Sequence, residues 1–440
     1  MTAFERDTLI RVALTPDDTV QAPAGLGDDI GRAVRTTPQR RPWLAIPRLG
    51  WPAQASPTFL VLLLTMLLVL LLGSLIVLSR LPVAARLATY HGDAERSGLM
   101  PGPGPLGDPV VAWEANRHGA MGATSMPLVA DGRVFVADDS GSVAALDESD
   151  GDELWEVAVG SPTRGSSVWV AGLIVVGSDS GTVVALRAAD GTEVWRFLAS
   201  GPVSASLAAV GEIVYVGSED GYLYALDAAS GELHWSVPAG GPITSGPAIF
   251  ESVIYVGAVG GRFSAIEAAS QAVNWSAELG PGGVTTPAVT NETIYAGRGF
   301  EASQAPHDLV ALAVADGSQR SVFESPSGRQ VFVGAVGEDL LYAVSEDNNV
   351  YALDPATGAV IWWHTTDGRV GALAGLVDGV LYVSSTDGTV RALDAATGAL
   401  RWSLAVEGEP TMPAVINGRV IVGTTLGKVV AIAGSSDSTP

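Results

Sequence analysis

One stretch of the sequence predicts the fold, because versions of it recur along most of the chain: Ala392-Leu393-Asp394-Ala395-Ala396-Thr397-Gly398-Ala399-Leu400-Arg401-Trp402. The same frame runs from Ala145 to Trp155, Ala185 to Trp195, Ala225 to Trp235 and Ala352 to Trp362, and more loosely from Ala265 to Trp275. From Trp155 to Trp275 the tryptophans recur every 40 residues, and Trp362 and Trp402 have the same spacing. A fixed period of this size indicates stacked supersecondary units.

One repeat contains four predicted strands. Runs rich in β-branched and aromatic residues at 213–217 and 222–226 are separated by the turn sequence Ser218-Glu219-Asp220-Gly221, which predicts a hairpin. A second turn leads into a strand with Trp235, and residues 244–249 form a strand of small side chains. Four strands in about 40 residues are typical of a β-propeller blade.

The repeats predict an eight-bladed ring. Eight hairpins are expected, at 133–151, 173–191, 213–231, 253–270, 293–317, 340–358, 380–398 and 419–434. The last hairpin has no tryptophan strand after it, whereas the strand around Trp113 has no hairpin before it. We therefore expect the Trp113 strand to complete the eighth blade. Trp113→Ala should then lower the stability of the protein as much as Trp402→Ala. The predicted fold class is an all-β, eight-bladed β-propeller with four-stranded blades, behind a single N-terminal transmembrane helix.

Composition excludes several kinds of site. The formal net charge of −23 argues against nucleic acid as a partner, and the carboxylates keep a large β surface soluble. The chain has no Cys, which excludes disulfides, thiolate metal sites and lipidated cysteines. Its five His residues show no metal-ligand spacing. We predict no catalytic, cofactor-binding or metal-binding residue, and no cofactor.

The N-terminal part predicts a membrane anchor. Residues 1–58 are expected to be a flexible tail, and Phe59 to Ser79 is an uncharged run of 21 residues, long enough to cross a bilayer as a helix. The alternative is a cleaved signal peptide, with Val83-Ala84-Ala85 as a weak cleavage site. Five Arg lie within about 30 residues before the run, at 32, 35, 40, 41 and 48, so the positive-inside rule places the tail in the cytoplasm and the propeller outside the cytoplasm.

Two further segments complete the predicted domain organisation. Residues 80–108 are rich in Pro and Gly and are expected to form a semi-extended stalk. The propeller occupies residues 109–434, and residues 435–440 form a disordered tail. The predicted location is therefore the cell membrane, with a single crossing.

The ALDxxTGxxxW frame resembles the tryptophan-docking repeat of eight-bladed propellers of the pyrroloquinoline-quinone (PQQ) type, over residues 109–434. The segment Tyr90–Gly98 is similar to a short motif that precedes the first blade in many such proteins. The resemblance implies that the tryptophans dock between neighbouring blades and are structural: Trp113, Trp155, Trp195, Trp235, Trp275, Trp362 and Trp402.

The resemblance implies two classes of function. Quinone-dependent dehydrogenases use an adjacent-cysteine disulfide, a calcium ion held by acidic and amide side chains, and a catalytic Asp; the disulfide cannot form here. Non-enzymatic members include BamB-like assembly factors, although BamB is a lipoprotein and this chain has no cysteine to lipidate. We predict a scaffold that binds a protein or a cell-envelope ligand. The alternatives are a PQQ-dependent oxidoreductase and an extracytoplasmic sensor.

Small polar residues mark the innermost strands. They are Thr124-Ser125, Ser166-Ser167, Ser204, Ser206, Thr244-Ser245, Thr285-Thr286 and Thr411. They predict either a ligand funnel, with Arg164 as its one arginine, or simply the small side chains that a narrow channel requires. The repeat aspartates Asp179, Asp220, Asp387 and Asp394 are expected to cap their own turns.

The fifth repeat departs from the frame. Ser321 replaces the expected tryptophan, and six extra residues fall within 298–307. This insertion contains Phe300 and His307, which predicts either a partner-binding loop or a neutral insertion. In the fourth repeat, Gln271 replaces the turn glycine.

Overall fold

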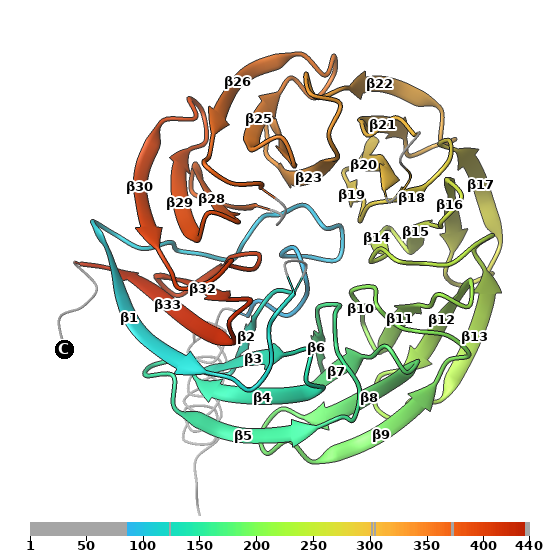
Figure 1. Ribbon diagram of the computed structural model, residues 1–440. Coiled ribbons are helices and arrows are strands. Elements are labelled where there is room, and N and C mark those ends of the chain that lie inside the picture. Colours follow the sequence, from blue (N-terminus) through green and yellow to red (C-terminus); the bar gives the residue numbers. More distant parts are fainter. Residues whose placement is uncertain (1–85, 123–124, 301, 303–304, 371–373, 436–440) are drawn as a thin grey trace, which may run out of the picture. The chain divides into compact units, whose positions relative to one another are not determined.

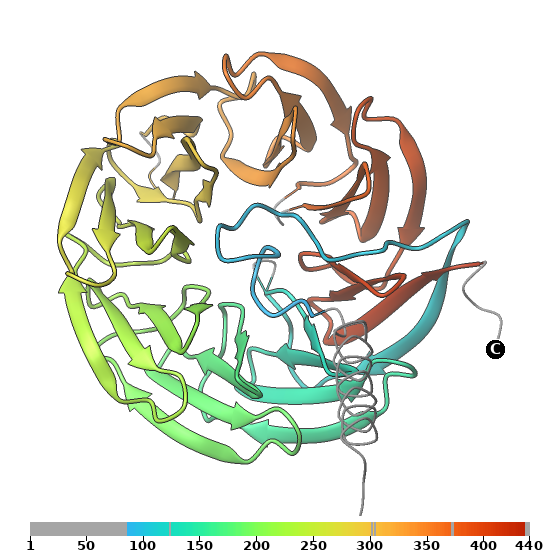
Figure 2. The same cartoon turned by 180° about the vertical axis from the view of Figure 1, so that it is seen from behind.

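The described residues form a ring of eight β-sheets around one axis (Figure 1). The computed structural model describes residues 86–122, 125–300, 302, 305–370 and 374–435. Figure 2 shows the same ring from behind. The predicted all-β, eight-bladed propeller is confirmed.

Blades 1 to 4 each consist of four consecutive antiparallel strands, ordered from the axis outward. Blade 1 is β2 (Leu128–Ala130), β3 (Arg133–Ala137), β4 (Ser142–Asp147) and β5 (Glu153–Ala158). Blade 2 is β6 (Val168–Val170), β7 (Leu173–Gly177), β8 (Thr182–Arg187) and β9 (Glu193–Leu198). Blade 3 is β10 (Ala208–Val210), β11 (Ile213–Gly217), β12 (Tyr222–Asp227) and β13 (Leu233–Pro238). Blade 4 is β14 (Ala248–Phe250), β15 (Val253–Gly257), β16 (Arg262–Glu267) and β17 (Val273–Glu278).

Blades 5 to 8 include the two exceptions to this plan. Blade 5 has a divided inner strand and consists of β18 (Gly283–Val284), β19 (Ala288–Val289), β20 (Thr293–Phe300), β21 (Leu309–Ala313) and β22 (Gln319–Phe323). Blade 6 is β23 (Val331–Val336), β24 (Leu341–Ser345), β25 (Asn349–Leu353) and β26 (Val360–Thr365). Blade 7 is β27 (Gly375–Val377), β28 (Val380–Ser385), β29 (Thr389–Asp394) and β30 (Leu400–Ala405). Blade 8 joins the two ends of the ring through β31 (Ala414–Ile416), β32 (Arg419–Gly423), β33 (Lys428–Gly434) and β1 (Pro109–Asn116).

The ring closes through the strand that contains Trp113. Strand β1 pairs antiparallel with β33, and Trp113 lies opposite Ala431. The indole is buried and donates a hydrogen bond from Nε1 to the carbonyl of Glu148 in blade 1, at 3.0 Å. The predicted closure is therefore confirmed.

Tryptophans of the regular repeats dock on the following blade. Trp195 of blade 2 donates from Nε1 to the carbonyl of Ala228 in blade 3, at 2.8 Å. Its ring covers Gly231, where an added Cβ would lie 2.6 Å from the indole. Gly231 also has a φ of +72°, which explains why the turn of the frame favours glycine. Gln271 adopts the same left-handed region, with a φ of +58°, in the repeat that lacks this glycine.

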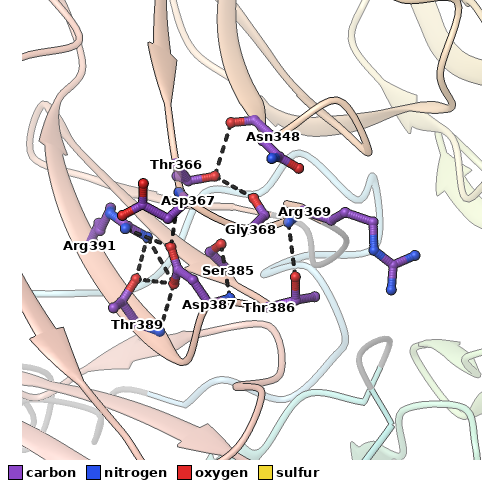
Figure 3. Close-up of polar contacts among 10 residues, drawn as sticks. All are labelled: Asn348, Thr366, Asp367, Gly368, Arg369, Ser385, Thr386, Asp387, Thr389 and Arg391. Carbon is purple, nitrogen blue, oxygen red and sulfur yellow. Dashed lines mark hydrogen bonds and ion pairs between the residues drawn. The ribbon is translucent and has the colours of Figure 1, made fainter.

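The repeat aspartates cap turns and also connect neighbouring blades (Figure 3). The carboxylate of Asp387, between β28 and β29, accepts a hydrogen bond from the amide of Thr389 at 3.0 Å. It also accepts from the amide of Asp367 in the preceding linker, at 3.2 Å, and pairs with Arg391 at 2.7 Å. The predicted capping of local turns is confirmed at Asp387, Asp220 and Asp394.

The chain before β1 crosses the centre of the ring (blue in Figure 1). We call residues 86–103 the plug. Its backbone bonds the inner strands of blade after blade, through the pairs Leu87–Val129, Ala88–Trp169, Ala94–Ile249, Glu95–Val289, Ser97–Val336, Gly98–Leu376 and Gly102–Val415. The stalk predicted for residues 80–108 is therefore wrong from Arg86 onward, because these polar backbone groups find partners on the inner strands instead of in water.

Three predicted segments lie outside the described residues: the tail 1–58, the membrane helix Phe59 to Ser79, and 436–440 of the C-terminal tail. In the part of the chain that the structure does describe, no helix has the length and apolar character needed to cross a membrane.

Candidate functional site

A pocket of about 80 Å³ lies beside the axis, among the inner strands of blades 3 to 6. A volume of about 10–15 Å³ is enough for one water molecule, so this pocket has room for a ligand group. Its lining residues are Tyr90, Ser204, Ser206, Thr244, Ser245, Gly246, Val284, Thr285, Thr286, Phe300 and Phe332. We call it the axial pocket.

Part of the hydroxyl-rich lining is structural. The Ser206 hydroxyl accepts a hydrogen bond from the amide of Ser166 one blade earlier, at 3.1 Å. The Thr286 hydroxyl accepts in the same way from the amide of Gly246, at 3.1 Å. Both bonds join residues 40 positions apart, so the repeat itself brings these hydroxyls to equivalent places. Each hydroxyl oxygen satisfies a backbone donor, while its own hydrogen is left to donate.

Two hydroxyls of the axial pocket belong to buried side chains and have no partner among the described residues. The Ser245 side chain is 7% exposed, and its Oγ bonds none of the described residues. Tyr90 is 3% exposed, and its hydroxyl likewise bonds no described residue. Burial raises the pKa of Tyr90 well above its usual range, an effect that the charge of Arg96 partly opposes, so the phenol stays protonated. Buried polar groups without partners are uncommon and need an explanation.

The plug holds Tyr90 in place through Arg96. The Arg96 side chain is completely buried and donates to the carbonyls of Pro247 and Leu207, at 3.1 and 2.6 Å, and to that of Tyr90. Its guanidinium also lies 5.5 Å from the centre of the Tyr90 ring. Gly246 leaves space for this arrangement, because a Cβ there would approach both Ser206 and Arg96. These bonds to carbonyls, together with one to the Thr89 hydroxyl at 3.0 Å, hold the guanidinium within the plug.

The insertion in blade 5 supplies the aromatic side of the pocket. It lengthens β20, so that Phe300 lies opposite Gly283 of β18. There the Phe300 ring meets Phe332 edge to face, with centroids 6.2 Å apart. A two-pronged ion pair between Arg298 and Asp308, at 2.5 and 2.9 Å, joins the two ends of the insertion. Asp308 is almost fully buried, so this pair anchors the segment that carries Phe300.

The structure brings together only part of the predicted funnel. Ser204, Ser206, Thr244-Ser245 and Thr285-Thr286 line the axial pocket, whereas Ser125, Ser166-Ser167 and Thr411 do not, and Thr124 lies outside the described residues. Arg164 pairs with Asp179, at 2.7 Å, instead of lining the pocket. This bond is what the structure shows for Asp179, in place of the predicted turn cap.

The two residues of the insertion that the sequence singled out lie at different places in the structure. Phe300 lines the axial pocket, whereas His307 bonds the carbonyl of Ala302 at 2.8 Å and lines another cavity. The sequence prediction missed Tyr90 and Phe332. The signal for Tyr90 was available, because it begins the short non-repeating motif before the first blade, but nothing in that motif indicates contact with blades 3 to 6.

The chemistry of the lining does not fit a calcium–quinone pair. The resemblance implies a calcium ion held by acidic and amide side chains, but the axial pocket is lined by hydroxyls, phenyl rings and a valine. Elsewhere in the described ranges, no group of three or more His, Asp and Glu side chains is placed to hold a metal ion. The described residues of the axial pocket therefore do not fit a quinone held beside a calcium ion.

Comparisons with known proteins agree with the eight-bladed propeller fold. The family model described as outer membrane protein assembly factor BamB matches residues 110–218, 179–331 and 306–437. The three ranges matched by the family model together cover more than half of the chain. No curated protein matches the sequence.

Solved structures of similar fold include designed, non-enzymatic and enzymatic proteins. The designed protein Ika8 is 17% identical with a TM-score of 0.65, covering 73% of this chain and 98% of its own. BamB from Moraxella catarrhalis is 20% identical with a TM-score of 0.59, covering 74% and 98%. Quinohemoprotein alcohol dehydrogenase from Comamonas testosteroni is 15% identical with a TM-score of 0.64, covering 79% and 80%. These likenesses show the fold alone; it is the family model that shows that the chain belongs to the family of outer membrane protein assembly factor BamB.

Proposed function

We propose that the chain is a non-enzymatic scaffold, anchored in the membrane, whose propeller binds a protein partner outside the cytoplasm. The observation that carries the proposal is the lining of the axial pocket, where hydroxyls and phenyl rings can bind a group, while the described residues that line it include no carboxylate, imidazole or ammonium to act on it. Among the described lining residues the Tyr90 phenol is the one titratable group, and burial holds its pKa far from neutral.

Membership of the BamB family supports a role in binding, since the name of that family describes an assembly factor. The anchor rests on the sequence: the uncharged run from Phe59 to Ser79 and the five arginines before it. Protease added to spheroplasts should digest the propeller and spare residues 1–58. Protection of the propeller would overturn the orientation.

The test of the scaffold is crosslinking in the native membrane, followed by identification of the captured proteins. Wild type should capture a defined partner, and Phe300→Ala should reduce that capture while leaving the protein folded. A matched control is Leu426→Ala, which removes an exposed apolar side chain outside the pocket. Equal capture by all three proteins would remove the axial pocket from the proposal.

The second candidate is a PQQ-dependent oxidoreductase, favoured by the similar fold of the quinohemoprotein alcohol dehydrogenase. Purified protein with added PQQ and calcium should show neither a bound chromophore nor alcohol-dependent dye reduction. Either signal would replace the scaffold with the enzyme. An extracytoplasmic sensor would instead require a change in the cytoplasmic tail when the partner binds.

A further inference from the structure

We infer that the axial pocket binds the carboxamide of a glutamine or asparagine side chain, presented by a loop of the partner protein. This inference rests on the proposed function and specifies the group that the scaffold recognises. It is argued from the charge, the hydrogen-bonding groups and the apolar surface of the pocket.

The charge of the pocket excludes ions. None of the described side chains that line it carries a charge at neutral pH, so a buried carboxylate, phosphate or ammonium would lose its hydration without gaining an ion-pair partner among them. Arg96 donates to protein carbonyls and to Thr89, and the Glu219 carboxylate, which does not line the pocket, accepts a hydrogen bond from the Ser204 hydroxyl at 2.6 Å. The ligand group is therefore neutral.

The two buried hydroxyls of the pocket favour a ligand group that both donates and accepts hydrogen bonds. The unpartnered hydroxyls of Ser245 and Tyr90 can each donate once and accept. A carboxamide has one acceptor oxygen and two N–H donors on a flat head, so a single group offers partners to both hydroxyls. An alkyl group would leave both unsatisfied, and buried polar groups left without partners are costly.

The open side of the pocket suits a short apolar stem. Phe300 and Phe332 are half-buried there, as are Ser204, Thr244 and Thr286. The methylene groups of a glutamine would pack against the two phenyl rings while its head reaches Ser245 and Tyr90. The pocket thus combines an apolar aromatic side with placed hydroxyl groups, and specific binding sites usually combine apolar surface with placed polar groups.

The experiment measures binding of three capped amino acids to the purified full-length protein by ligand-observed NMR. The probes are the N-acetyl methylamides of glutamine, glutamate and norleucine, which have side chains of similar length and differ at the end. Glutamine should bind with a Kd of about 1 mM, as expected for so small a ligand. Glutamate at neutral pH and norleucine should each bind at least about tenfold more weakly.

Variants test the hydroxyl directly. Ser245→Ala should weaken binding of the glutamine probe about two- to tenfold, the range expected for one hydrogen bond. Ser125→Ala is the matched control, because Ser125 occupies the equivalent position of blade 1 outside the pocket and is also buried. Because the Ser245 hydroxyl has no partner in the folded protein, Ser245→Ala should leave the thermal midpoint unchanged.

Each other outcome overturns the inference. Equal binding of the glutamine and glutamate probes would remove the selectivity for a neutral head, and absence of glutamine binding would leave the hydroxyls to water. Tighter binding of N-acetylglucosamine than of the glutamine probe would replace the protein loop with a glycan. If crosslinking still captures a partner through Phe300, these failures leave the scaffold intact; PQQ-dependent dye reduction would instead defeat the proposed function itself.

Discussion

Blade 3 and blade 5 carry the same hairpin but use it differently. In blade 3, Tyr215, Ala225 and Trp235 lie side by side across three strands, and the two rings pack 5.9 Å apart. In blade 5 the corresponding set begins with Tyr295 and ends with Ser321, so the outer ring is missing. The side chains of a regular blade are committed to packing. Loss of the frame in blade 5 coincides with the one insertion that brings a large side chain to the axis.

Blade 5 also lacks one of the two contacts by which a regular blade such as blade 2 meets the next blade. Blade 2 reaches blade 3 through the indole of Trp195 on Gly231. Blade 5 reaches blade 6 through Phe323, whose ring lies 5.0 Å from that of Tyr351. Blade 2 makes the same kind of ring contact with blade 3, between Phe197 and Tyr224 at 5.3 Å. Blade 5 therefore keeps the phenylalanine contact of a regular blade and lacks the docking indole.

The largest effect on stability is expected from a substitution in a regular blade. Trp195→Ala should lower the free energy of unfolding by about 3–5 kcal/mol, because it empties a packed site and removes the bond to Ala228. Ser321→Ala in blade 5 should change it by less than about 0.5 kcal/mol. Urea denaturation of both variants measures the difference, and equal losses would mean that the two blades are not packed differently.

The ring closure gives a related contrast. Trp113 is buried and donates to Glu148 of blade 1, whereas Trp402 faces blade 8, in which β33 and β1 belong to opposite ends of the propeller and no turn joins them. The Trp402 indole is only partly buried and bonds no described residue. We therefore expect Trp113→Ala to destabilise the protein by about 1–2 kcal/mol more than Trp402→Ala, instead of equally. Equal losses in urea would restore the expectation from the sequence.

The plug connects both kinds of blade and should make stability depend on pH. His91 donates from Nε2 to the carbonyl of Gly334 in blade 6, at 2.7 Å, and burial lowers its pKa to about 4. The unfolded chain, with a pKa near 6.5, binds the proton more readily, so stability is complete above about pH 6.5 and falls as the pH drops toward 4. The loss should be of the order of 3 kcal/mol.

Denaturation between pH 7 and 4 checks this effect, with His91→Gln as the matched variant. The variant should lose the His91 contribution to the pH dependence while keeping that of the surface carboxylates. An unchanged profile in His91→Gln would show that the imidazole does not control it.

The anchor of the blade 5 insertion should have an intermediate effect. Asp308→Asn removes the charge from the buried pair with Arg298 and should cost about 2 kcal/mol, the usual range for hydrogen bonds to charged groups. Asp179→Asn, which weakens the exposed pair with Arg164, should cost less than about 1 kcal/mol. If the two losses are equal in urea, the insertion is not anchored through Asp308.

The sequence predicts the regular blades well and the axial pocket only in part. Periodicity specifies the strands and the docking tryptophans because they repeat along the chain. It specifies the ring closure because the last repeat lacks a strand that the Trp113 segment can supply. The plug does not repeat, and its bonds join Leu87 to Val129 or Glu95 to Val289, so no local pattern indicates them. The direction of Phe300 depends on pairing between β20 and β18, which a longer hairpin alone does not specify.

Restoring the missing tryptophan should have the smallest effect. In regular blades the indole covers the turn glycine of the next blade, but at Gly358 of blade 6 an added Cβ would first meet the carbonyl of Val322, at 3.0 Å, and the amide of Phe323. Strand β22 itself therefore occupies the place where the ring would dock. Ser321→Trp should then leave the new indole in solvent and change the free energy of unfolding by less than about 1 kcal/mol. Tryptophan fluorescence and urea denaturation test both points, and a gain above about 2 kcal/mol with a buried indole would show that blade 5 keeps the regular docking site and lacks only the side chain.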